Sequence, residues 1–444
     1  MLEDIIKERK KKLAKLKDKG INPYPATVKR TALIGEVLKN FNRWQKNQKI
    51  LFLTGRLRAW RDQGKIIFAD LEDESGRLQL IFNKKQTKQF DLIKETFDSG
   101  DFVEAAGKLF KTQRGEKSLA VSSARIISKS LRPLPTEWFG LKDVEERFRR
   151  RYLDLILNPE VKVKIQKRSE IIAQLRQSLR REGFIEVETP ILQPLPGGAL
   201  ARPFITHHQA LNCDFYLRVA PELYLKRLLV AGFEKIYEIG RVFRNEGIDR
   251  DHNPEFTIFE FYWAYQDWKG LMKFTEKLLK KFIPGKWARI TYQEAIKKYA
   301  KKDIKKLTAE DIDEVFKKEV GPKLIKPIFI THYPKLISPF AKSCEDNPEL
   351  TERFQLIVDG MEIVNGWSEL NDPRDQKERL EEQERKYRKG IQEVSRLDED
   401  FLEALEYGMP PAAGWGIGVD RLAALITKSH NIKEIIVFPT LRPK

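Results

Sequence analysis

The segment F-R-N-E-G-I-D-R-D-H-N-P-E-F-T-I-F-E-F-Y-W-A-Y, residues 243–265, decides the fold of this chain. Its pattern predicts a strand, a charged loop and a returning strand. Because side chains alternate along a strand, residues two apart lie on one face. The hairpin therefore presents an arginine, two carboxylates, two aromatic rings and a loop histidine: Arg244, Glu246, Glu260, Phe256, Tyr262 and His252.

This set of side chains suits a nucleotide together with a cationic small molecule. A guanidinium group binds anionic oxygens in a planar fork, and an aromatic ring can stack on a base. The same residues also fit a core hairpin that carries scattered surface charges, so the hairpin alone leaves both interpretations open.

Length and charge narrow the class of protein. A chain of 444 residues is too long for one hydrophobic core, which predicts two or three domains. Lys and Arg total 83 against 65 Asp and Glu, so the net charge is +18. Such a surplus favours a polyanionic partner, most simply nucleic acid, although a demand for solubility would give the same charge.

The cysteines indicate the cellular compartment. Cys213 and Cys344 are far apart and form no C-x-x-C motif, which argues against a disulfide framework or a zinc–cysteine site and fits a reducing cytoplasm. The N-terminus has no apolar segment of the signal-peptide type, and no apolar run is long enough to span a bilayer. We therefore expect a cytoplasmic protein without membrane association.

Residues 1–48 form a basic N-terminal extension. A helix with a thin apolar stripe is predicted at 3–19, and Gly20 ends it. The simplest interpretation is a solvated helix, and the sharper alternative is a contact with a nucleic-acid backbone.

Residues 49–130 predict a five-stranded barrel. The strands fall at 50–58, 65–72, 77–82, 102–109 and 119–127, with a helix at 86–96. This order is typical of the OB-fold, which commonly binds oligonucleotides. Phe68 and Gln79 fall on the polar face of adjacent strands, where a ring can stack on a base and an amide can read its edge. A register slip would instead bury Phe68 in the core.

The next segment, 131–143, predicts a stiff linker, because it contains Arg132-Pro133-Leu134-Pro135. Residues 144–444 mix helices and strands and form the second domain. Within it, the lysine-rich residues 267–328 predict a helical insertion, and residues 373–394 predict a charged helix with a solvated face.

Three segments of the second domain resemble the motifs of class II aminoacyl-tRNA synthetases. They are G-F through E-T-P at 183–190, F-R-N-E at 243–246, and G-W-G-I-G-V-D-R at 414–421, which opens a helix. Each alone is weak, but together, spaced over a domain of this size, they are specific. The resemblance implies an α+β chain, in which an N-terminal OB-fold β-barrel precedes a catalytic domain with an antiparallel sheet flanked by helices.

Further segments resemble the bacterial type of lysyl-tRNA synthetases. They are G-G-A-L-A-R-P-F-I-T-H-H at 197–208, A-P-E-L-Y-L-K-R at 220–227 and S-E-L-N-D at 368–372. The resemblance covers almost the whole chain. It implies that L-lysine and ATP form a lysyl-adenylate, that lysine is then transferred to tRNA(Lys), and that the enzyme is a homodimer.

The resemblance also implies the site residues. Catalysis falls to Arg244, Glu246 and Arg421, and ATP binding to these three together with His252, Phe256, Glu362, Gly416 and Gly418. Lysine binding falls to Gly198, Glu222, Arg244, Glu260, Tyr262, Asn365 and Glu369. Among these, Glu369 takes the side-chain ammonium, and a buried carboxylate there discriminates lysine from uncharged amino acids.

Two further expectations concern the metal and the anticodon. Mg²⁺ is implied as cofactor, with Glu362 as its ligand, but the usual second acidic position is Gln355, whose amide is a weaker ligand for a hard cation. In the barrel, anticodon reading is assigned to Phe68 and Gln79, with Arg61 from the neighbouring turn, and the expected anticodon is uridine-rich.

The alternatives are distinguishable. A protein lysyltransferase related to the enzyme that modifies elongation factor P would share the catalytic domain but lack the OB-fold, so residues 49–130 count against it. Aspartyl- and asparaginyl-tRNA synthetases share the architecture but need a cationic anchor, and Glu369 has the opposite charge. An inactive nucleic-acid binder is disfavoured by the presence of Arg244, Glu246 and Arg421.

Overall fold

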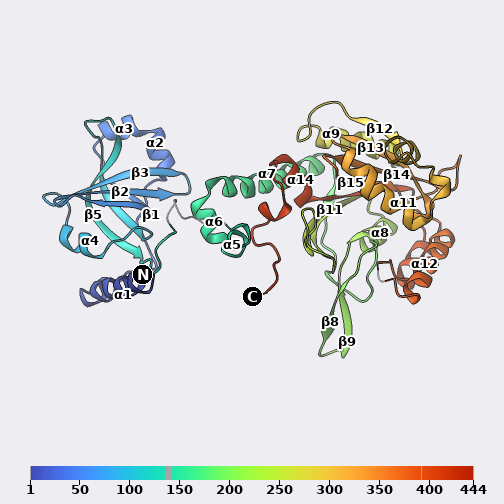
Figure 1. The fold of residues 1–444 in the computed structure, drawn as a ribbon, viewed down its shortest axis with the longest axis horizontal. Helices are drawn as coiled ribbons and strands as arrows, with labels where there is room; N and C mark the ends of the chain where they lie inside the picture. Colours follow the sequence, from blue (N-terminus) through green and yellow to red (C-terminus); the bar gives the residue numbers. More distant parts are fainter. Residues whose placement is uncertain (1, 136–142, 392, 444) are drawn as a thin grey trace. The chain divides into compact units, whose positions relative to one another are not determined.

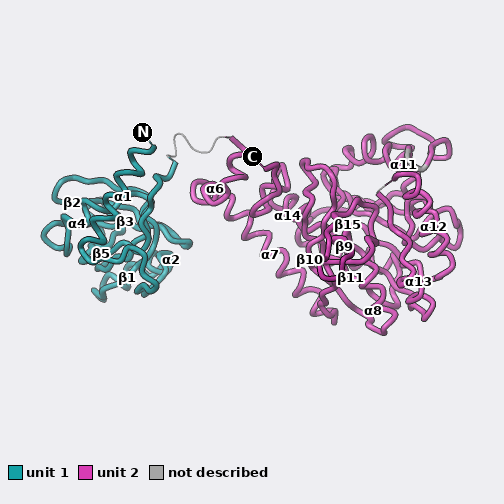
Figure 2. The backbone as a smooth tube through the Cα atoms, turned by 90° about the horizontal axis from the view of Figure 1, so that it is seen from below, with its two compact units in different colours: residues 1–140 teal, residues 141–444 magenta. Residues whose placement is uncertain are grey.

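The computed structural model describes residues 2–135, 143–391 and 393–443, and the chain divides into two compact units (Figures 1 and 2). Unit 1 spans 1–140 and unit 2 spans 141–444. Of the predicted linker 131–143, residues 136–142 lie outside the described residues. Each unit has its own hydrophobic core.

Unit 1 is a closed barrel with the strand order β1-β2-β3-β5-β4, which confirms the predicted OB-fold (Figure 1). Its strands are β1 (Leu51–Asp62), β2 (Ile66–Asp73), β3 (Gly76–Asn83), β4 (Phe102–Lys111) and β5 (Lys117–Ser128). Helix α4 (Phe90–Thr96) follows β3 and starts later than predicted. The delay arises because the Thr87 hydroxyl bonds the Asn83 N–H and the Val121 carbonyl, which holds the preceding residues in a turn.

The faces of the barrel strands follow the predicted alternation. Ile67 and Leu80 are fully buried, whereas Phe68 and Gln79 are only partly buried on the opposite face. Pairing of Phe68 with Ile81 and of Asp70 with Gln79 fixes the register, so the register slip that would bury Phe68 is excluded.

The N-terminal extension shares the barrel's core. Helix α1 (Leu2–Asp18) packs beside α4 and buries Leu16, while the Arg9 guanidinium donates to the carbonyls of Ser99 and Ser130. Helices α2 (Ile34–Lys39) and α3 (Phe41–Lys46) bury further apolar side chains in the same cluster. Most of α1 is exposed, as predicted for a solvated helix, while Arg9 and Leu16 are buried on the side that faces the rest of unit 1.

Unit 2 is built on an eight-stranded sheet with the order β12-β13-β14-β15-β16-β11-β10-β6. Its strands are β6 (Ile185–Glu186), β10 (Lys235–Phe243), β11 (Glu255–Ala264), β12 (Ala288–Thr291), β13 (Ile328–Pro334), β14 (Leu350–Val358), β15 (Met361–Ser368) and β16 (Ala412–Gly418). The six central strands are antiparallel, as predicted, whereas the outer pairs β12–β13 and β6–β10 are parallel.

One face of this sheet is apolar and carries the core of unit 2. Phe259, Phe261 and Trp415 pack there against helices α7 (Pro159–Arg181), α9 (Trp268–Leu279) and α14 (Val419–Ile426). Because strand side chains alternate, the residues between them point to the other face, where helix α8 (Glu222–Val230) packs against β11. The polar residues of the central strands are thereby gathered on the α8 side.

The remaining elements surround this frame. They are α5 (Val144–Arg149), α6 (Arg151–Leu157), α10 (Tyr292–Ala295), α11 (Ala309–Val315), α12 (Pro373–Arg388), α13 (Glu399–Glu406), and a small sheet of β7 (Leu192–Gln193), β9 (Cys213–Leu217) and β8 (Phe204–His208). Residues 267–328 are not purely helical, because β12 within them joins the main sheet. None of the described helices is both long and apolar enough to cross a membrane.

Candidate active site

The register of the sheet brings polar residues of five strands into one row. Gln355 pairs with Asn365, Asn365 with Gly416, Gly416 with Glu260, and Glu260 with Glu238. Paired residues of neighbouring strands point to the same face, so these positions form a polar band across the α8 side of the sheet.

A second row, two residues further along, lies beside Glu369. Trp367, Gly414 and Tyr262 pair in sequence across β15, β16 and β11. A methyl group at Gly414 would lie 2.5 Å from the Tyr262 ring and 2.8 Å from Glu369 Oε1. Glycine is thus required because the Tyr262 ring and the Glu369 carboxylate pack directly against this backbone.

The Glu369 carboxylate is held by one oxygen only. Its Oε2 accepts the indole N–H of Trp367 at 2.9 Å and lies 2.6 Å from the ammonium of Lys226. Its Oε1 is buried and has no hydrogen-bond partner among the described residues. Because a buried unpaired acceptor is costly, such an oxygen indicates the position of a ligand's donor group.

Two more buried carboxylates lie close by. Glu222, the first residue of α8, accepts from Lys226 Nζ through Oε1 at 2.5 Å, and Glu260 Oε2 accepts from the Tyr262 hydroxyl at 3.3 Å. Gly198 has a φ of 84°, and a Cβ there would lie 2.8 Å from Glu222 Cβ. The predicted residues Gly198, Glu222, Glu260, Tyr262 and Glu369 are therefore brought together, and we call Glu222, Glu260 and Glu369 the carboxylate cluster.

Burial makes this cluster a receptor for cations. Burial raises the pKa of Glu260 to about 8, with a further increase from the Glu222 charge, and it raises the pKa of Glu369 to about 7 although Lys226 opposes it. The pKa of Glu222 is raised for the same reason. An ammonium group that entered the cluster would stabilise the ionised carboxylates, so cation binding is favoured here.

A second group of predicted residues gathers around Arg421 on α14. The Arg421 guanidinium donates to His252 Nε2 at 2.9 Å, to the Asp251 carbonyl at 3.2 Å and to the Glu362 carbonyl at 3.5 Å. Since arginine only donates, Nε2 of His252 is the acceptor, and its Nδ1–H donates to Asp249 at 2.8 Å. Both ring nitrogens of His252 are thus engaged, and the N–H groups of the partly buried Arg421 guanidinium are the donors here that suit contact with anionic oxygens.

Arg244 lies between the two groups. Its guanidinium stands 5.2 Å from the centre of the Phe256 ring and donates to the Val219 carbonyl at 3.4 Å. Burial lowers the pKa of Arg244, and the charges that act on it include Glu260 from the carboxylate cluster and Arg421 from the other side. A planar cation at this position can bridge anionic groups of two neighbouring ligands.

The hairpin itself differs from its prediction in one respect. Strand β10 ends at Phe243 and β11 begins at Glu255, so Arg244 and Glu246 lie in the loop. The expectation that they share a strand face was wrong, because the Glu246 N–H bonds the Arg244 carbonyl at 2.8 Å and turns the chain. Phe256, Glu260 and Tyr262 do share a strand face, as predicted.

The predicted metal position carries one carboxylate and one amide. Gln355 Nε2 donates to Glu362 Oε2 at 2.6 Å, while Gln355 Oε1 accepts the Tyr333 hydroxyl at 2.7 Å. The amide oxygen is thus engaged by Tyr333, and Glu362 is the only carboxylate of this pair. Across the described residues no three acidic, histidine or cysteine side chains cluster in a way that could hold a metal ion.

The glycines of the third segment line the polar face. A Cβ at Gly416 would lie 3.3 Å from Glu260 Cγ, and one at Gly418 would lie 3.7 Å from the Arg421 side chain. They therefore border the carboxylate cluster and the arginine group respectively.

Sequence reasoning missed two residues that hold the site. Lys226 joins Glu222 to Glu369, and its spacing of four residues from Glu222 on a helix was the signal that could have revealed it. Arg353 donates to Asn365 Oδ1 at 3.0 Å and to the Ile337 carbonyl at 2.8 Å. No local pattern indicates Arg353, because its contacts depend on the pairing of β14 with β15.

The outer face of the barrel brings the other predicted residues together. Arg61 pairs with Phe68 across β1 and β2, and Gln79 on β3 lies opposite Asp70. The Gln79 amide oxygen accepts from the Ser118 hydroxyl at 2.9 Å, which leaves its N–H groups pointing elsewhere. Arg61 was predicted in a turn but lies within β1, because the strand runs on to Asp62.

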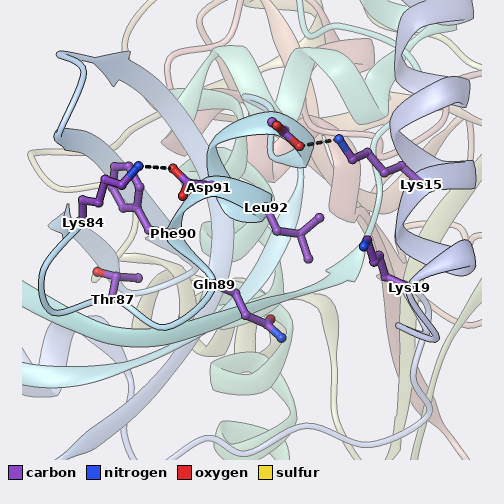
Figure 3. A pocket seen from close by; sticks show the side chains of 9 residues that line it. Lys15, Lys19, Lys84, Thr87, Gln89, Phe90, Asp91 and Leu92 are labelled. Atoms are coloured by element: carbon purple, nitrogen blue, oxygen red, sulfur yellow. Dashed lines mark hydrogen bonds and ion pairs between the residues drawn. The ribbon is translucent and has the colours of Figure 1, made fainter.

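A separate cavity of about 560 Å³ opens between α1 and α4 of unit 1 (Figure 3). Lys15, Lys19 and Lys84 line it, but Lys15 is paired with Glu95 and Lys84 with Asp91. The three predicted anticodon residues are not among its lining residues, so it is distinct from that face.

Comparison with known proteins gives a consistent picture for both units. The family described as tRNA synthetases class II (D, K and N) matches residues 143–442, and the OB-fold nucleic acid binding domain matches residues 51–127. A lysine–tRNA ligase of Pelotomaculum thermopropionicum is 45% identical, with 100% of this chain and 96% of the relative covered. One of Moorella thermoacetica is also 45% identical, with 99% and 98% covered.

Proposed function

Since this chain belongs to the class II tRNA synthetases (D, K and N), we propose that it attaches lysine to its cognate tRNA through a lysyl-adenylate made from ATP. The family name leaves three amino acids open. The observation that selects lysine is the buried Glu369, whose Oε1 has no partner among the described residues. A carboxylate in this position attracts an ammonium group and repels the side chain of aspartate.

The carboxylate cluster offers one acceptor to each ammonium of lysine. Glu369 Oε1 and the Tyr262 hydroxyl receive the side-chain ammonium, and Glu222 beside Gly198 receives the α-amino group. Asn365, which Arg353 holds in place, faces the substrate carboxylate. The substrate carboxylate is then directed toward Arg244, away from the three acids.

Activation is an in-line displacement at the α-phosphate of ATP. A carboxylate oxygen of lysine attacks phosphorus, and the bond to the departing pyrophosphate breaks. Arg244 holds the α-phosphate and the attacking carboxylate, so it lowers the repulsion between two anions. Arg421 and His252 bind the outer phosphates, Phe256 stacks on adenine, and Glu246 accepts from its amino group.

A divalent cation fits this site in a limited way. Glu362 would hold Mg²⁺ together with oxygens of the ATP phosphates, and the ion would offset their charge during the displacement. The Gln355 amide lies with its N–H toward Glu362 and contributes no second charge. We therefore assign one strong metal position rather than several.

The barrel reads the tRNA. Phe68 would stack on an anticodon base, Gln79 would read a base edge through its N–H groups, and the exposed Arg61 would contact the backbone. A uridine-rich anticodon, as in tRNA(Lys), suits this set. The barrel also disfavours the protein lysyltransferase alternative, whose members lack it.

We further propose that the enzyme is a cytoplasmic homodimer. Ile185 at the sheet edge and Ile191 and Leu192 in the following segment are 52%, 44% and 47% exposed. Large apolar side chains exposed in this way are enriched at subunit interfaces. A sedimentation mass of two chains at micromolar concentration supports the dimer, and a mass of one chain contradicts it.

ATP–pyrophosphate exchange across the twenty amino acids tests the function. We expect exchange that depends on lysine and not on aspartate or asparagine, followed by lysine transfer to tRNA(Lys). Exchange driven by either of the other two family substrates would refute the assignment. Lysine-dependent exchange without transfer to any tRNA, but with transfer to a protein, would instead support the lysyltransferase.

A further inference from the structure

We propose that Lys226 is a positioning residue for lysine recognition, which joins Glu222 to Glu369 and sets the charge of the site so that it accepts a net monocation. This inference rests on the proposed function and deepens it. It assigns a role to the buried ammonium of Lys226, which contacts two of the acids that we propose bind the cationic substrate.

The contacts of Lys226 are those of a permanent part of the site. Its side chain is completely buried, with Nζ 2.5 Å from Glu222 Oε1, 2.6 Å from Glu369 Oε2 and 4.9 Å from the centre of the Phe340 ring. Lys226 lies on the buried side of α8, where Leu225 and Leu229 are fully buried too. A side chain packed on all sides in this way has no exposed position to which it could withdraw.

Lys226 and a substrate ammonium would contact different oxygens of Glu369, so they would not compete for the same acceptor. On Glu369, Lys226 and the Trp367 indole both use Oε2, while Oε1 is left for another donor. Oε1 lies beside the Gly414 backbone and the Tyr262 ring, since a Cβ at Gly414 would lie 2.8 Å from Oε1 and 2.5 Å from that ring. Glu369 can therefore bind Lys226 and a substrate ammonium at the same time, one on each oxygen.

Lys226 sets the net charge that the site presents to the substrate. When both are ionised, Glu222 and Glu369 bring two negative charges and Lys226 brings one positive charge, so these three side chains together carry one negative charge. Lysine with both amino groups protonated and its carboxylate ionised carries one positive charge, which neutralises the site. Without Lys226 two buried carboxylates would face each other, and one of them would take up a proton.

The other charged groups around Glu222 and Glu369 are present both with and without Lys226. Among the described residues, Glu260, Tyr262 and Arg353 also act on Glu222 or Glu369, and the Trp367 indole donates to Glu369. Among the described residues only Lys226 contacts both carboxylates, so none of these groups replaces its ammonium. A change in proton binding after loss of Lys226 therefore reports on the carboxylate cluster, in which Glu222 and Glu369 have lost their shared ammonium partner.

The test compares Lys226→Met, which keeps the stem and removes the charge, with Lys226→Arg, which keeps the charge. Lysine-dependent exchange gives the KM for lysine and for ATP between pH 6 and pH 8. We expect Lys226→Met to raise the lysine KM about 30-fold or more, as on loss of one partner of a buried charge pair, with the ATP KM nearly unchanged. The lysine KM of this variant should also rise more steeply as the pH falls, by about one further proton, and Lys226→Arg should restore part of both effects.

The matched control is Lys129→Met in unit 1, because Lys129 is also buried between two carboxylates, Asp98 and Asp101. It should leave the lysine KM and its pH dependence unchanged. A lower lysine KM in Lys226→Met would show that Lys226 competes with the substrate and would overturn the proposal. So would an unchanged KM, or an equal loss of lysine and ATP affinity. If the wild type shows no lysine-dependent exchange, the proposed function itself fails, which is a separate result.

Discussion

A buried lysine between two carboxylates occurs in each unit, and the two cases differ in one respect. In the barrel, Lys129 lies 2.5 Å from Asp98 and 2.8 Å from Asp101, and both oxygens of Asp101 accept further backbone N–H groups. In unit 2, Lys226 lies between Glu222 and Glu369, but Oε1 of Glu369 accepts nothing among the described residues. A complete network of acceptors indicates structure, and a single open acceptor indicates a place for a ligand.

The pKa values of the acids around the two lysines differ at Asp98. Burial tends to raise the pKa of Asp98, but hydrogen bonds from Lys12 and Lys129 outweigh it, so the pKa lies below the usual value. Burial raises the pKa of Asp101 in spite of Lys129. Burial raises the pKa of Glu369 to about 7 in spite of Lys226. Hydrogen bonds from two lysines thus favour the ionised form of Asp98, whereas at Glu369 burial outweighs the contact with Lys226, so a further cation would stabilise the carboxylate cluster.

The largest expected effect is the loss of stability when the buried lysine of the barrel, Lys129, is replaced. Lys129→Met should lower the free energy of unfolding of unit 1 by roughly 3–5 kcal/mol, because it leaves Asp98 and Asp101 without their buried partner. Hydrogen exchange of the full chain should locate the loss in unit 1 and leave the sheet of unit 2 protected. A rise of the lysine KM equal to that of Lys226→Met would mean that both clusters act only through stability.

The next largest effect concerns the open acceptor itself. Glu369→Gln removes the charge that faces the substrate ammonium, and we expect a loss of about 2–5 kcal/mol in lysine binding. Isothermal titration with lysine measures it, and titration with ATP should change little. The matched variant is Asp101→Asn, which should affect stability alone. Unchanged lysine affinity in Glu369→Gln would show that the ammonium binds elsewhere.

The third prediction asks whether the barrel has a functional surface apart from its buried network. Phe68→Ala should weaken tRNA binding by about 1–3 kcal/mol through lost stacking on a base, without affecting lysyl-adenylate formation. Phe52→Ala is the matched control, since Phe52 is also a partly buried ring on the barrel, nine residues along β1 from Arg61, the partner of Phe68. Equal losses of tRNA affinity in both variants would assign Phe68 to folding rather than recognition.

Local patterns explain which features the sequence could predict. Alternation predicted the barrel faces around Phe68 and the shared face of Glu260 and Tyr262, because both depend on side-chain period alone. The loop position of Arg244 was not predictable, since a strand end is set by turn hydrogen bonds and not by the strand pattern. Lys226 and Arg353 were missed for a related reason: their partners Glu369 and Asn365 are distant in sequence and adjacent only through sheet register.

The smallest effect concerns the metal position beside the same polar band. Gln355 donates to Glu362, so Glu362 is the one charged ligand there, and we expect lysyl-adenylate formation to require more magnesium than with two acids. Gln355→Glu places a second carboxylate next to Glu362. Two adjacent carboxylates repel each other and bind a divalent cation more tightly, so the magnesium titration of exchange should shift to lower concentration.

A neutral variant separates charge from the hydrogen bond in this prediction. Gln355→Met keeps the approximate size, removes the donor to Glu362 and adds no charge, so its titration should not move to lower magnesium. Tyr333 donates to the Gln355 side-chain oxygen and can donate equally to a glutamate oxygen, which keeps the new carboxylate oriented in Gln355→Glu. Superimposable titrations for wild type and Gln355→Glu would mean that position 355 is not a metal ligand. The charge that offsets the ATP phosphates would then come from Arg244 and Arg421, with whatever ion Glu362 alone can hold.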